Sequence, residues 1–441
     1  GHPYFDAVAN YGGITKWSAV IYMPERIPEA VRHAYTHMKH GRLGPALVEM
    51  PSNVMALEYP EDTVSYTPVQ RHTSAASSED VRDTVSALLK ASNPMINAGQ
   101  GVMYAEATPE LVEFAELANI PVMTTLAGKS GFPEDHRLSL GAGAITCTLM
   151  VHHFLQSTDF ILGVGTSFTR SIFNTAMPED VPLAQITNCP EDINKGYEVS
   201  LGAIGDAKVV LRQMIEEVKR QVGEDGREDA RGVEKEIADV RKKWMAEWEP
   251  RLTSSEVPIS PYRVFRELET GVDVANTIIT HDSGYPRDQL VPFWKPVTPR
   301  GYIGWGKSTQ LGYGLGLAIG AKLAAPEKQV INIMGDAAFG MAGMDIETAA
   351  RSEIPILTVV LNNGVMTHYQ EYMPYASDVW DSNKLGGEYA KVAEGLGAAS
   401  ERVDDPDQLA PAIQRGLEAN ANGQPALIEV MTKSEETVSR Y

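Results

Sequence analysis

The sequence predicts an α/β protein built on doubly wound parallel sheets. Short apolar runs that end in Gly, Asp or Asn alternate with segments of helical periodicity, as at residues 330–334 and 356–361. This alternation is typical of βαβ units whose parallel strands are buried on both faces. A similar alternation across residues 94–165 predicts a second, Rossmann-like sheet. A chain of 441 residues also exceeds what one hydrophobic core organises, so we expect several domains.

Composition and charge exclude several classes of partner. The content of 43% hydrophobic and 22% charged residues is ordinary for a soluble globular protein. The net charge of −20 argues against nucleic acid or an anionic membrane as a partner. No apolar run reaches the length of a transmembrane helix. The two cysteines, Cys147 and Cys189, form no CxxC and no metal-ligand spacing, so we expect a cytoplasmic location.

Changes in composition divide the chain into four parts. Residues 1–60 hold a helical stretch and a strand at 46–50, and a polar linker leads to a central Rossmann-like domain at 75–215. Residues 216–258 are rich in charge and predict a connecting helix and linker, in which two tryptophans and Met245 lie at helical spacing. Residues 259–441 form the last domain.

Asp336 and Asn363 each follow an apolar run of the last domain. Ligands of parallel sheets bind outside the carboxyl ends of the strands, which is where both side chains belong. Carboxylate, amide and loop carbonyl oxygens are ligands of Mg²⁺, and a helix starting near Ala337 would favour a phosphate beside it. The alternative is an ordinary βαβ unit in which both residues only cap turns. The apolar face expected for that helix comprises Phe339, Met341, Met344, Ile346 and Ala350.

The pattern Gly335-Asp336 followed by Asn362-Asn363 resembles the GD(G)…NN signature of thiamine diphosphate enzymes. The wider resemblance is to the group of acetolactate synthase, oxalyl-CoA decarboxylase and benzoylformate decarboxylase. It implies that Asp336, Asn363 and the backbone carbonyl of Val365 bind Mg²⁺. The other cofactor contacts implied here are Gly335, Ala337, which replaces the usual third glycine, and Ala338.

Residues 311–320, LGYGLGLAIG, resemble the MGFGLPAAIGA helix of the same family. The resemblance implies that Leu311 holds the cofactor in a bent shape and that the carbonyl of Thr309 accepts a hydrogen bond from its amino group. It also places Ser283 and Tyr285, which follow a strand at 277–280, beside the diphosphate. His368 lies in the segment that faces the substrate, where it either relays protons or is an ordinary surface residue.

Three other patterns are weaker. Residues 301–308, GYIGWGKS, match the GxxxxGK[ST] pattern of a nucleotide-binding loop, but the prolines before them deny the buried strand that such a loop needs. A GxGxxG motif starting at Gly99 fails because Tyr104 replaces its third glycine. FAD is therefore possible in the central domain but not favoured, and we prefer an empty structural domain. His152 and His153 are adjacent, which favours solvated or packed side chains over metal ligands.

Residues 41–51, GRLGPALVEMP, resemble the segment that closes the pyrimidine-binding domain of the family. We therefore expect most of that domain, with its activating Glu, to lie upstream of Gly1 or on a separate chain, and we expect activity to require it. The resemblance implies a thiamine diphosphate- and Mg²⁺-dependent decarboxylase or carboligase that acts on a small 2-oxo acid as a homodimer or homotetramer. Two alternatives are a CoA-substrate lyase resembling oxalyl-CoA decarboxylase, and a non-catalytic cofactor-binding homologue.

Overall fold

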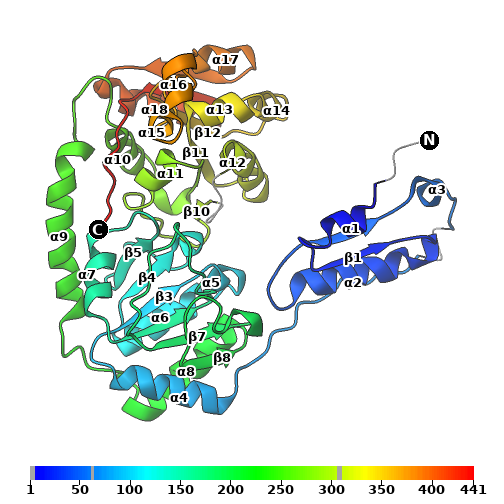
Figure 1. Ribbon diagram of the computed structural model, residues 1–441, viewed down its shortest axis with the longest axis vertical. Coiled ribbons are helices and arrows are strands. Elements are labelled where there is room, and N and C mark those ends of the chain that lie inside the picture. Colours follow the sequence, from blue (N-terminus) through cyan, green and yellow to red (C-terminus); the bar gives the residue numbers. More distant parts are fainter. Residues whose placement is uncertain (1–4, 61–63, 305–309) are drawn as a thin grey trace.

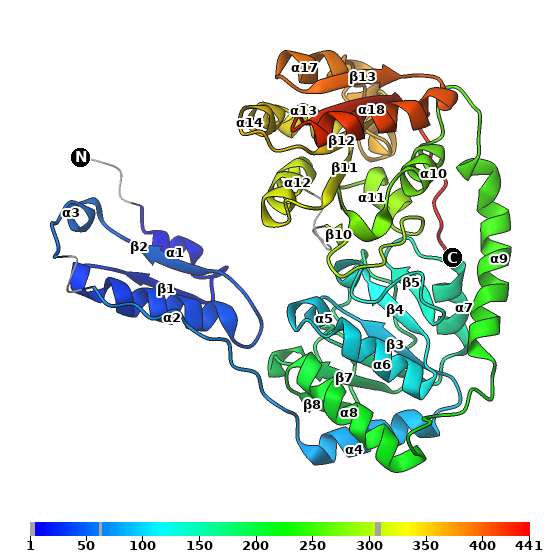
Figure 2. The same ribbon diagram turned by 180° about the vertical axis from the view of Figure 1, so that it is seen from behind.

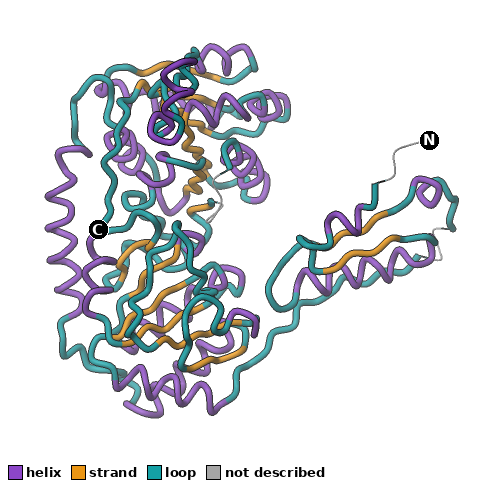
Figure 3. The backbone as a smooth tube through the Cα atoms, in the orientation of Figure 1, coloured by secondary structure: helices purple, strands orange, loops and turns teal. Residues whose placement is uncertain are grey.

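The computed structural model describes residues 5–60, 64–304 and 310–441. It contains two six-stranded sheets in which every described strand pair is parallel, and a small N-terminal unit that stands apart from them (Figure 1). Figure 3 shows the strands of the two large sheets as separate groups, one above the other. The predicted α/β class with doubly wound parallel sheets is therefore confirmed. Within the described residues, no helix combines the length and hydropathy that crossing a membrane requires.

The N-terminal unit is a two-stranded parallel sheet with helices around it. Its strands are only half-buried, and an extended linker joins it to the rest (Figure 1). Its loop at Arg42 reaches the central domain, where the guanidinium forms an ion pair with Asp192. The elements of this unit are α1 (Ala7–Tyr11), β1 (Trp17–Val20), α2 (Ile27–Lys39), β2 (Ala46–Glu49) and α3 (Ser52–Met55).

The central domain is a doubly wound sheet with the strand order β5-β4-β3-β6-β7-β8. The chain builds outward from β3 in one direction and from β6 in the other, so the order reverses between these two strands. Its strands are β3 (Pro94–Ala98), β4 (Val122–Thr125), β5 (Ser139–Gly143), β6 (Phe160–Val164), β7 (Leu183–Thr187) and β8 (Leu201–Ile204). Its helices are α4 (Ser78–Lys90), α5 (Gly101–Tyr104), α6 (Thr108–Ala118), α7 (Leu149–Ser157) and α8 (Ala207–Val222).

The charged segment at 216–258 is not one connecting helix. Its first residues complete α8, and a separate helix, α9 (Val233–Leu252), runs along both large domains (Figure 2). α8 ends at Gly223, where the chain leaves the helix with φ +94°. Glycine suits this position because few other residues adopt that backbone conformation. On α9 the two tryptophans that lie at helical spacing, Trp244 and Trp248, are both 2% exposed and pack on the ring of Phe293.

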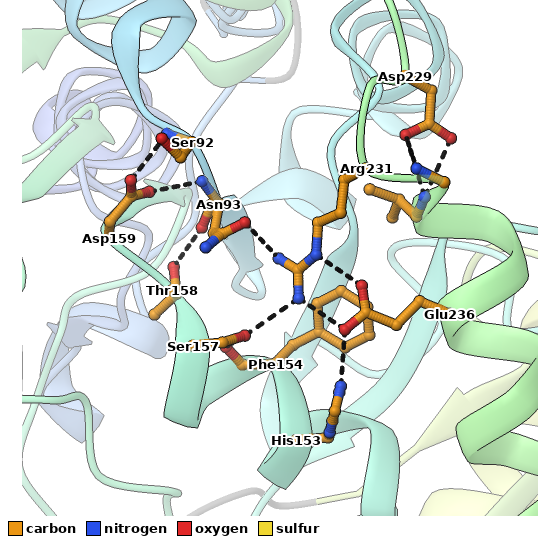
Figure 4. A network of polar contacts seen from close by, with 12 residues as sticks. Ser92, Asn93, His153, Phe154, Ser157, Thr158, Asp159, Asp229, Arg231 and Glu236 are labelled. Atoms are coloured by element: carbon orange, nitrogen blue, oxygen red, sulfur yellow. Dashed lines mark hydrogen bonds and ion pairs between the residues drawn. The ribbon is translucent and has the colours of Figure 1, made fainter.

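Hydrogen bonds from the side chain of Arg231 attach the start of α9 to the central domain (Figure 4). The guanidinium of Arg231 donates to Asn93 at 2.8 Å and forms an ion pair with Glu236 at 2.6 Å. Glu236 also contacts Nε2 of His153 at 2.7 Å. His153 therefore has a structural partner here, while the ring of the adjacent His152 packs against Tyr441.

The C-terminal domain has the strand order β10-β9-β11-β12-β14-β13. Its strands are β9 (Thr277–His281), β10 (Tyr302–Ile303), β11 (Gln329–Gly335), β12 (Leu357–Asn362), β13 (Ala399–Val403) and β14 (Ala426–Met431). Its helices are α10 (Pro261–Gly271), α11 (Tyr285–Leu290), α12 (Tyr313–Ala324), α13 (Asp336–Ala342), α14 (Asp345–Arg351), α15 (Tyr369–Tyr372), α16 (Pro374–Trp380), α17 (Tyr389–Gly395) and α18 (Leu409–Ala421). The predicted strands at 277–280, 330–334 and 356–361 correspond to β9, β11 and β12.

The helix expected after Asp336 is split in two, and part of its predicted apolar face is wrong. Gly343 separates α13 from α14, and a Cβ there would lie 2.7 Å from the ring of Phe339. Met341 and Met344 are 63% and 68% exposed. At about 100° per residue they lie about 200° and about 140° around the helix from the buried Phe339, so they do not share its face.

A buried ion pair lies where the central and C-terminal domains meet. Nζ of Lys129 contacts Glu134 at 2.5 Å, and both side chains are almost fully buried. The ammonium also lies over the ring of Tyr302, at 5.3 Å from its centroid. The backbone N–H of Glu134 donates to the carbonyl of Pro296, so this cluster joins the segment between β4 and β5 to the chain at and before β10.

Candidate active site

The carboxyl ends of three neighbouring strands meet at one edge of the C-terminal sheet. β11 lies between β9 and β12, and the register aligns their ends. The strand order reverses between β9 and β11, because β10 lies on the far side of β9. Ligands of open parallel sheets bind in the crevice at such a switch point. Asp282, Asp336 and Asn363 each directly follow one of these three strands and therefore lie at this switch point.

Asp336 is buried at the end of β11, with 3% of its surface exposed. Its Oδ1 accepts a hydrogen bond from the N–H of Ala337 at 2.8 Å, and its Oδ2 accepts one from Gly364 at 2.8 Å. Burial raises the pKa of this carboxyl and backbone hydrogen bonds oppose the shift, with no cationic side chain of the described chain among the causes. A buried carboxylate that lacks a counter-ion is suited to bind a cation.

Asn363 lies in the loop that reaches Asp336. Its Oδ1 accepts from the N–H of Val365 at 3.1 Å, and its Nδ2 donates to Thr367 at 3.3 Å. Gly364 between them has φ +71°, a conformation that favours glycine. Within the described ranges, no group of three or more His, Cys, Asp or Glu side chains could hold a metal. An ion here would need amide, carbonyl and cofactor oxygens beside the single carboxylate, which is a donor set that suits Mg²⁺.

A second buried carboxylate supports this loop from behind. Glu429 on β14 is 0% exposed, and it accepts hydrogen bonds from Nδ2 of Asn362 at 2.7 Å and from the N–H of Ala390 at 2.9 Å. Asn362 in turn accepts from the N–H of Gly364 at 3.1 Å. Glu429 was not singled out from the sequence. The signal that could have indicated it is a charged residue inside the apolar run ALIEVM.

Tyr285, the first residue of α11, and His368, which precedes α15, contact each other across the segments that follow β9 and β12. The hydroxyl of Tyr285 is hydrogen-bonded to Nε2 of His368. Burial raises the pKa of Tyr285 to about 12, so its hydroxyl stays protonated at neutral pH. Nδ1 of His368 lies 3.5 Å from the carboxylate of Glu371. Ser283, the other predicted residue of the first loop, is 3% exposed and donates its N–H to Asp282 at 2.8 Å.

Leu311 lies at the start of α12 and is packed partly against the core of the C-terminal domain. The next residue, Gly312, has φ +91°, and a Cβ on it would lie 3.0 Å from the Cβ of Ala342 on α13. The turn therefore rests on the helix that begins at Asp336. Thr309, which the family resemblance assigns to the cofactor, lies outside the described residues.

The small residues around Asp336 differ in their exposure. Ala338 is 1% exposed and belongs to the hydrophobic core, so its side chain is not placed to contact a ligand. Gly335 and Ala337 are half-buried beside the carboxylate. The predicted residues that the structure describes thus lie after β9, β11 and β12 and at the start of α12, which is hydrogen-bonded to Asp282.

A separate cavity of about 1080 Å³ lies at the switch point of the central sheet. Gly99, Gly101 and Gly165 line it, and a Cβ on Gly99 would lie 2.4 Å from the carbonyl oxygen of Gly165. The cavity also touches the C-terminal domain at Ile303 and Gly304, but its lining does not include Asp336. Its volume is that of a site for a large ligand. The central domain therefore has room for a ligand. That it is empty stays a prediction, which depends on the missing third glycine of the GxGxxG pattern.

Two comparisons assign the fold and the site to a class of proteins. The description "Thiamine pyrophosphate enzyme, C-terminal TPP binding domain" matches residues 282–430, which hold the crevice. The description "Thiamine pyrophosphate enzyme, central domain" matches residues 81–214. The chain belongs to the thiamine pyrophosphate enzymes, and its cofactor is thiamine diphosphate, which is the same compound.

The relatives define the branch of the family more closely. The chain is 30% identical over 446 residues to the acetolactate synthase large subunit of Corynebacterium glutamicum, with 96% of this chain and 68% of the relative covered. It is 28% identical over 444 residues to a probable acetolactate synthase large subunit of Methanococcus aeolicus, covering 96% and 73%. It is also 28% identical over 451 residues to glyoxylate carboligase of Escherichia coli O157:H7, covering 97% and 74%. The chain is a thiamine diphosphate-dependent enzyme related to acetolactate synthases and carboligases.

Proposed function

We propose that this enzyme decarboxylates a 2-oxo acid and joins the remaining fragment to a second carbonyl compound, with Mg²⁺ as the metal. The observation that carries the proposal is the buried Asp336 carboxylate, which lacks a cationic partner in the described chain and contacts the Asn363–Val365 loop. This arrangement, at the carboxyl edge of a sheet matched by the cofactor-binding family, supports a metal–diphosphate site.

Each loop of the crevice has a distinct task in this proposal. Asp336, Asn363 and the Val365 carbonyl would hold Mg²⁺, and the loop of Ser283 would face the diphosphate. When bound, the cofactor supplies an electron sink for making or breaking a carbon–carbon bond beside a carbonyl. Leu311 contributes an apolar wall at the start of α12. Since its neighbour Gly312 packs on α13, this wall is fixed relative to the metal ligands.

Tyr285 and His368 are the groups that we assign to proton transfer. The pair shares a hydrogen bond beside the crevice, and its tyrosine is protonated at neutral pH. A histidine in contact with such a hydroxyl can deliver a proton to an oxygen of the substrate and regain one from water, while the tyrosine fixes the orientation of its ring. Of the two interpretations of His368, this contact favours the proton relay over the ordinary surface residue.

The proposal is tested with the protein in its natural full-length form. The protein is incubated with thiamine diphosphate, Mg²⁺ and either pyruvate or glyoxylate, and the CO₂ released is measured together with the condensation product. Omission of the cofactor and chelation of the metal are the matched controls. We expect CO₂ release that both controls abolish. Release from oxalyl-CoA but from neither 2-oxo acid would contradict the proposal and support a CoA-substrate lyase.

We also propose that the enzyme is an assembly of at least two copies in the cytoplasm. Large aromatic side chains beside the crevice are exposed in the single chain, among them Tyr372 at 73%, Tyr375 at 69% and Trp380 at 66%. Exposed apolar patches of this kind mark protein interfaces. Cys147 and Cys189 are both unpaired, which fits a reducing compartment. Sedimentation of the purified protein tests the assembly, and a monomer at micromolar concentration would contradict it.

A further inference from the structure

Asp282 is a buried carboxylate that has no role in the proposed reaction. It directly follows β9 and is 0% exposed. Burial raises the pKa of its carboxyl, and hydrogen bonds from backbone N–H groups, not a cationic side chain, oppose that shift. A buried charge is costly unless its hydrogen bonds are satisfied, so the partners of this carboxylate show what it stabilises.

Two of the three N–H groups that donate to Asp282 belong to the start of α12. Both carboxylate oxygens accept from the N–H of Gly312 at 3.0 Å, and Oδ2 also accepts from the N–H of Gly314 at 3.0 Å. Oδ1 accepts from the N–H of Ser283 at 2.8 Å. The N-cap residue of α12 is Gly312, which has no side chain to satisfy the free N–H groups of the first turn. Asp282, at the end of β9, therefore acts as the N-terminal cap of α12 in place of a side chain at Gly312.

The same bonds determine where Leu311 lies. Gly312 follows Leu311 directly and has φ +91°, so the chain turns sharply at this point. Beyond the turn, Gly314 is in close contact with the sheet, since a Cβ on it would lie 2.8 Å from Oδ1 of Asn332. The turn is thus held by the carboxylate on one side and by tight backbone packing on the other.

We propose that Asp282 is a positioning residue, which holds the Leu311–Gly312 turn in the conformation that receives the cofactor. This rests on the proposed function in one respect, the contact of Leu311 with the cofactor. Asp282 acts through the backbone of the turn and does not touch the reacting atoms. Without its carboxylate, the turn would sample other conformations and the apolar wall at Leu311 would lose its fixed place.

Asp282→Asn is the variant that tests this idea, because it keeps the size of the side chain. One acceptor oxygen becomes an NH₂ group, which can only donate. Each oxygen of Asp282 accepts from the N–H of Gly312 and from one further N–H, so in either orientation of the amide its NH₂ group would face backbone N–H groups without an acceptor. Two controls are matched to it. Asp159→Asn makes the same change in a remote carboxylate that accepts from the N–H groups of Ser92 and Asn93 (Figure 4).

The second control, Thr280→Val, removes a different contact to the same helix. The hydroxyl of Thr280 donates to the carbonyl of Gly314 at 3.1 Å and does not reach the turn at Leu311. Amide hydrogen exchange of the peptide 310–315 is measured for each variant, with and without thiamine diphosphate and Mg²⁺. In Asp282→Asn we expect exchange faster by about tenfold or more and a loss of the protection that cofactor binding gives. In both controls we expect that protection to remain.

Turnover provides the second readout. At saturating cofactor, kcat of Asp282→Asn should fall by about tenfold or more. Its effect should not add to that of Leu311→Ala, because both changes disturb the same contact. Unchanged exchange at 310–315 would overturn the proposal. Faster exchange with full cofactor protection and normal kcat would also overturn it, leaving Asp282 as a helix cap only. The exchange measurement needs no substrate, so it stands even where the proposed reaction fails.

Discussion

The hydroxyl of Tyr285 and Nε2 of His368 share a hydrogen bond that joins the loop after β9 to the loop after β12. The centroids of the two rings lie 5.2 Å apart. His368 has φ +68°, a backbone conformation that few residues other than glycine adopt. Backbone strain of this kind is found preferentially at active sites, where the surrounding structure holds it in place. The hydrogen bond therefore joins two of the predicted site residues, and the backbone conformation of His368 that allows it is energetically costly.

Replacement of Tyr285 by Phe should lower turnover while leaving the fold intact. The substitution removes the hydroxyl that contacts His368 and keeps the ring. If the pair transfers protons, kcat should fall by about a hundredfold or more. Tyr372→Phe is the matched control, because that tyrosine is 73% exposed and its ring also lies near His368, at 6.2 Å between centroids. Steady-state kinetics of both variants at several pH values provides the measurement, and equal effects of the two substitutions would exclude the relay.

Asp336→Ala should abolish retention of thiamine diphosphate. The carboxylate is the only charged side chain among the three proposed metal ligands, so its loss removes the group that attracts the cation. The fold should persist, because the variant also removes a buried charge. Titration calorimetry with cofactor and Mg²⁺ measures the affinity, with Asp345→Ala, an exposed carboxylate on α14, as the control. Unchanged affinity in Asp336→Ala would show that the site has been assigned wrongly.

Leu311→Ala should impair catalysis more than folding. Leu311 is only half-buried, so its truncation leaves a smaller cavity than a core leucine would. Leu315 on the same helix is 0% exposed and is the matched control. We expect Leu315→Ala to lose about 2–5 kcal/mol of stability with normal kcat per folded molecule. We expect the opposite for Leu311→Ala. A large fall in melting temperature with normal kcat in Leu311→Ala would identify it as an ordinary core residue.

The strands could be predicted from the sequence because parallel strands buried on both faces leave continuous apolar runs. The runs at 330–334 and 356–361 correspond to β11 and β12 for this reason. Helical faces were less predictable. Met341 and Met344 are apolar but lie about 200° and about 140° around a helix from Phe339, so hydrophobicity alone did not show that they are exposed. Likewise, the charges of 216–258 did not reveal the break after α8.

The site was predictable to the extent that strand ends determine it. Asp336 and Asn363 follow adjacent strands, so their proximity follows from the sheet alone. The bond between Tyr285 and His368 depends on the path of two loops and on side-chain rotamers, which no local pattern encodes. Asp282 carried the same signal as Asp336, an acidic residue after an apolar strand, but its partners lie 30 and 32 residues further along the chain.

The protonation of His281 should make the stability of the protein depend on pH. His281 is 0% exposed, and burial lowers its pKa from 6.5 to about 4. Nδ1 lies 3.0 Å from the carbonyl of Asp282, to which it can donate. Nε2 faces the backbone of Gly304 so closely that a Cβ there would lie 1.9 Å from it. Among the described residues Nε2 has no hydrogen-bond partner, so the ring is neutral in the folded state above about pH 4.

Stability should consequently fall as the pH decreases from about 6.5 to about 4. Above this window His281 is neutral in both states and contributes no pH dependence. Within it the unfolded chain binds a proton that the folded chain does not, so the free energy of unfolding decreases by up to about 1.4 kcal/mol per pH unit. Below it both states are protonated. Denaturant unfolding of the wild type and of His281→Asn, at several pH values from 7.5 to 4, isolates the effect because all other titrating groups are shared. The wild type should show the steeper loss, and parallel curves for the two proteins would mean that His281 is protonated in the folded state as readily as in the unfolded one.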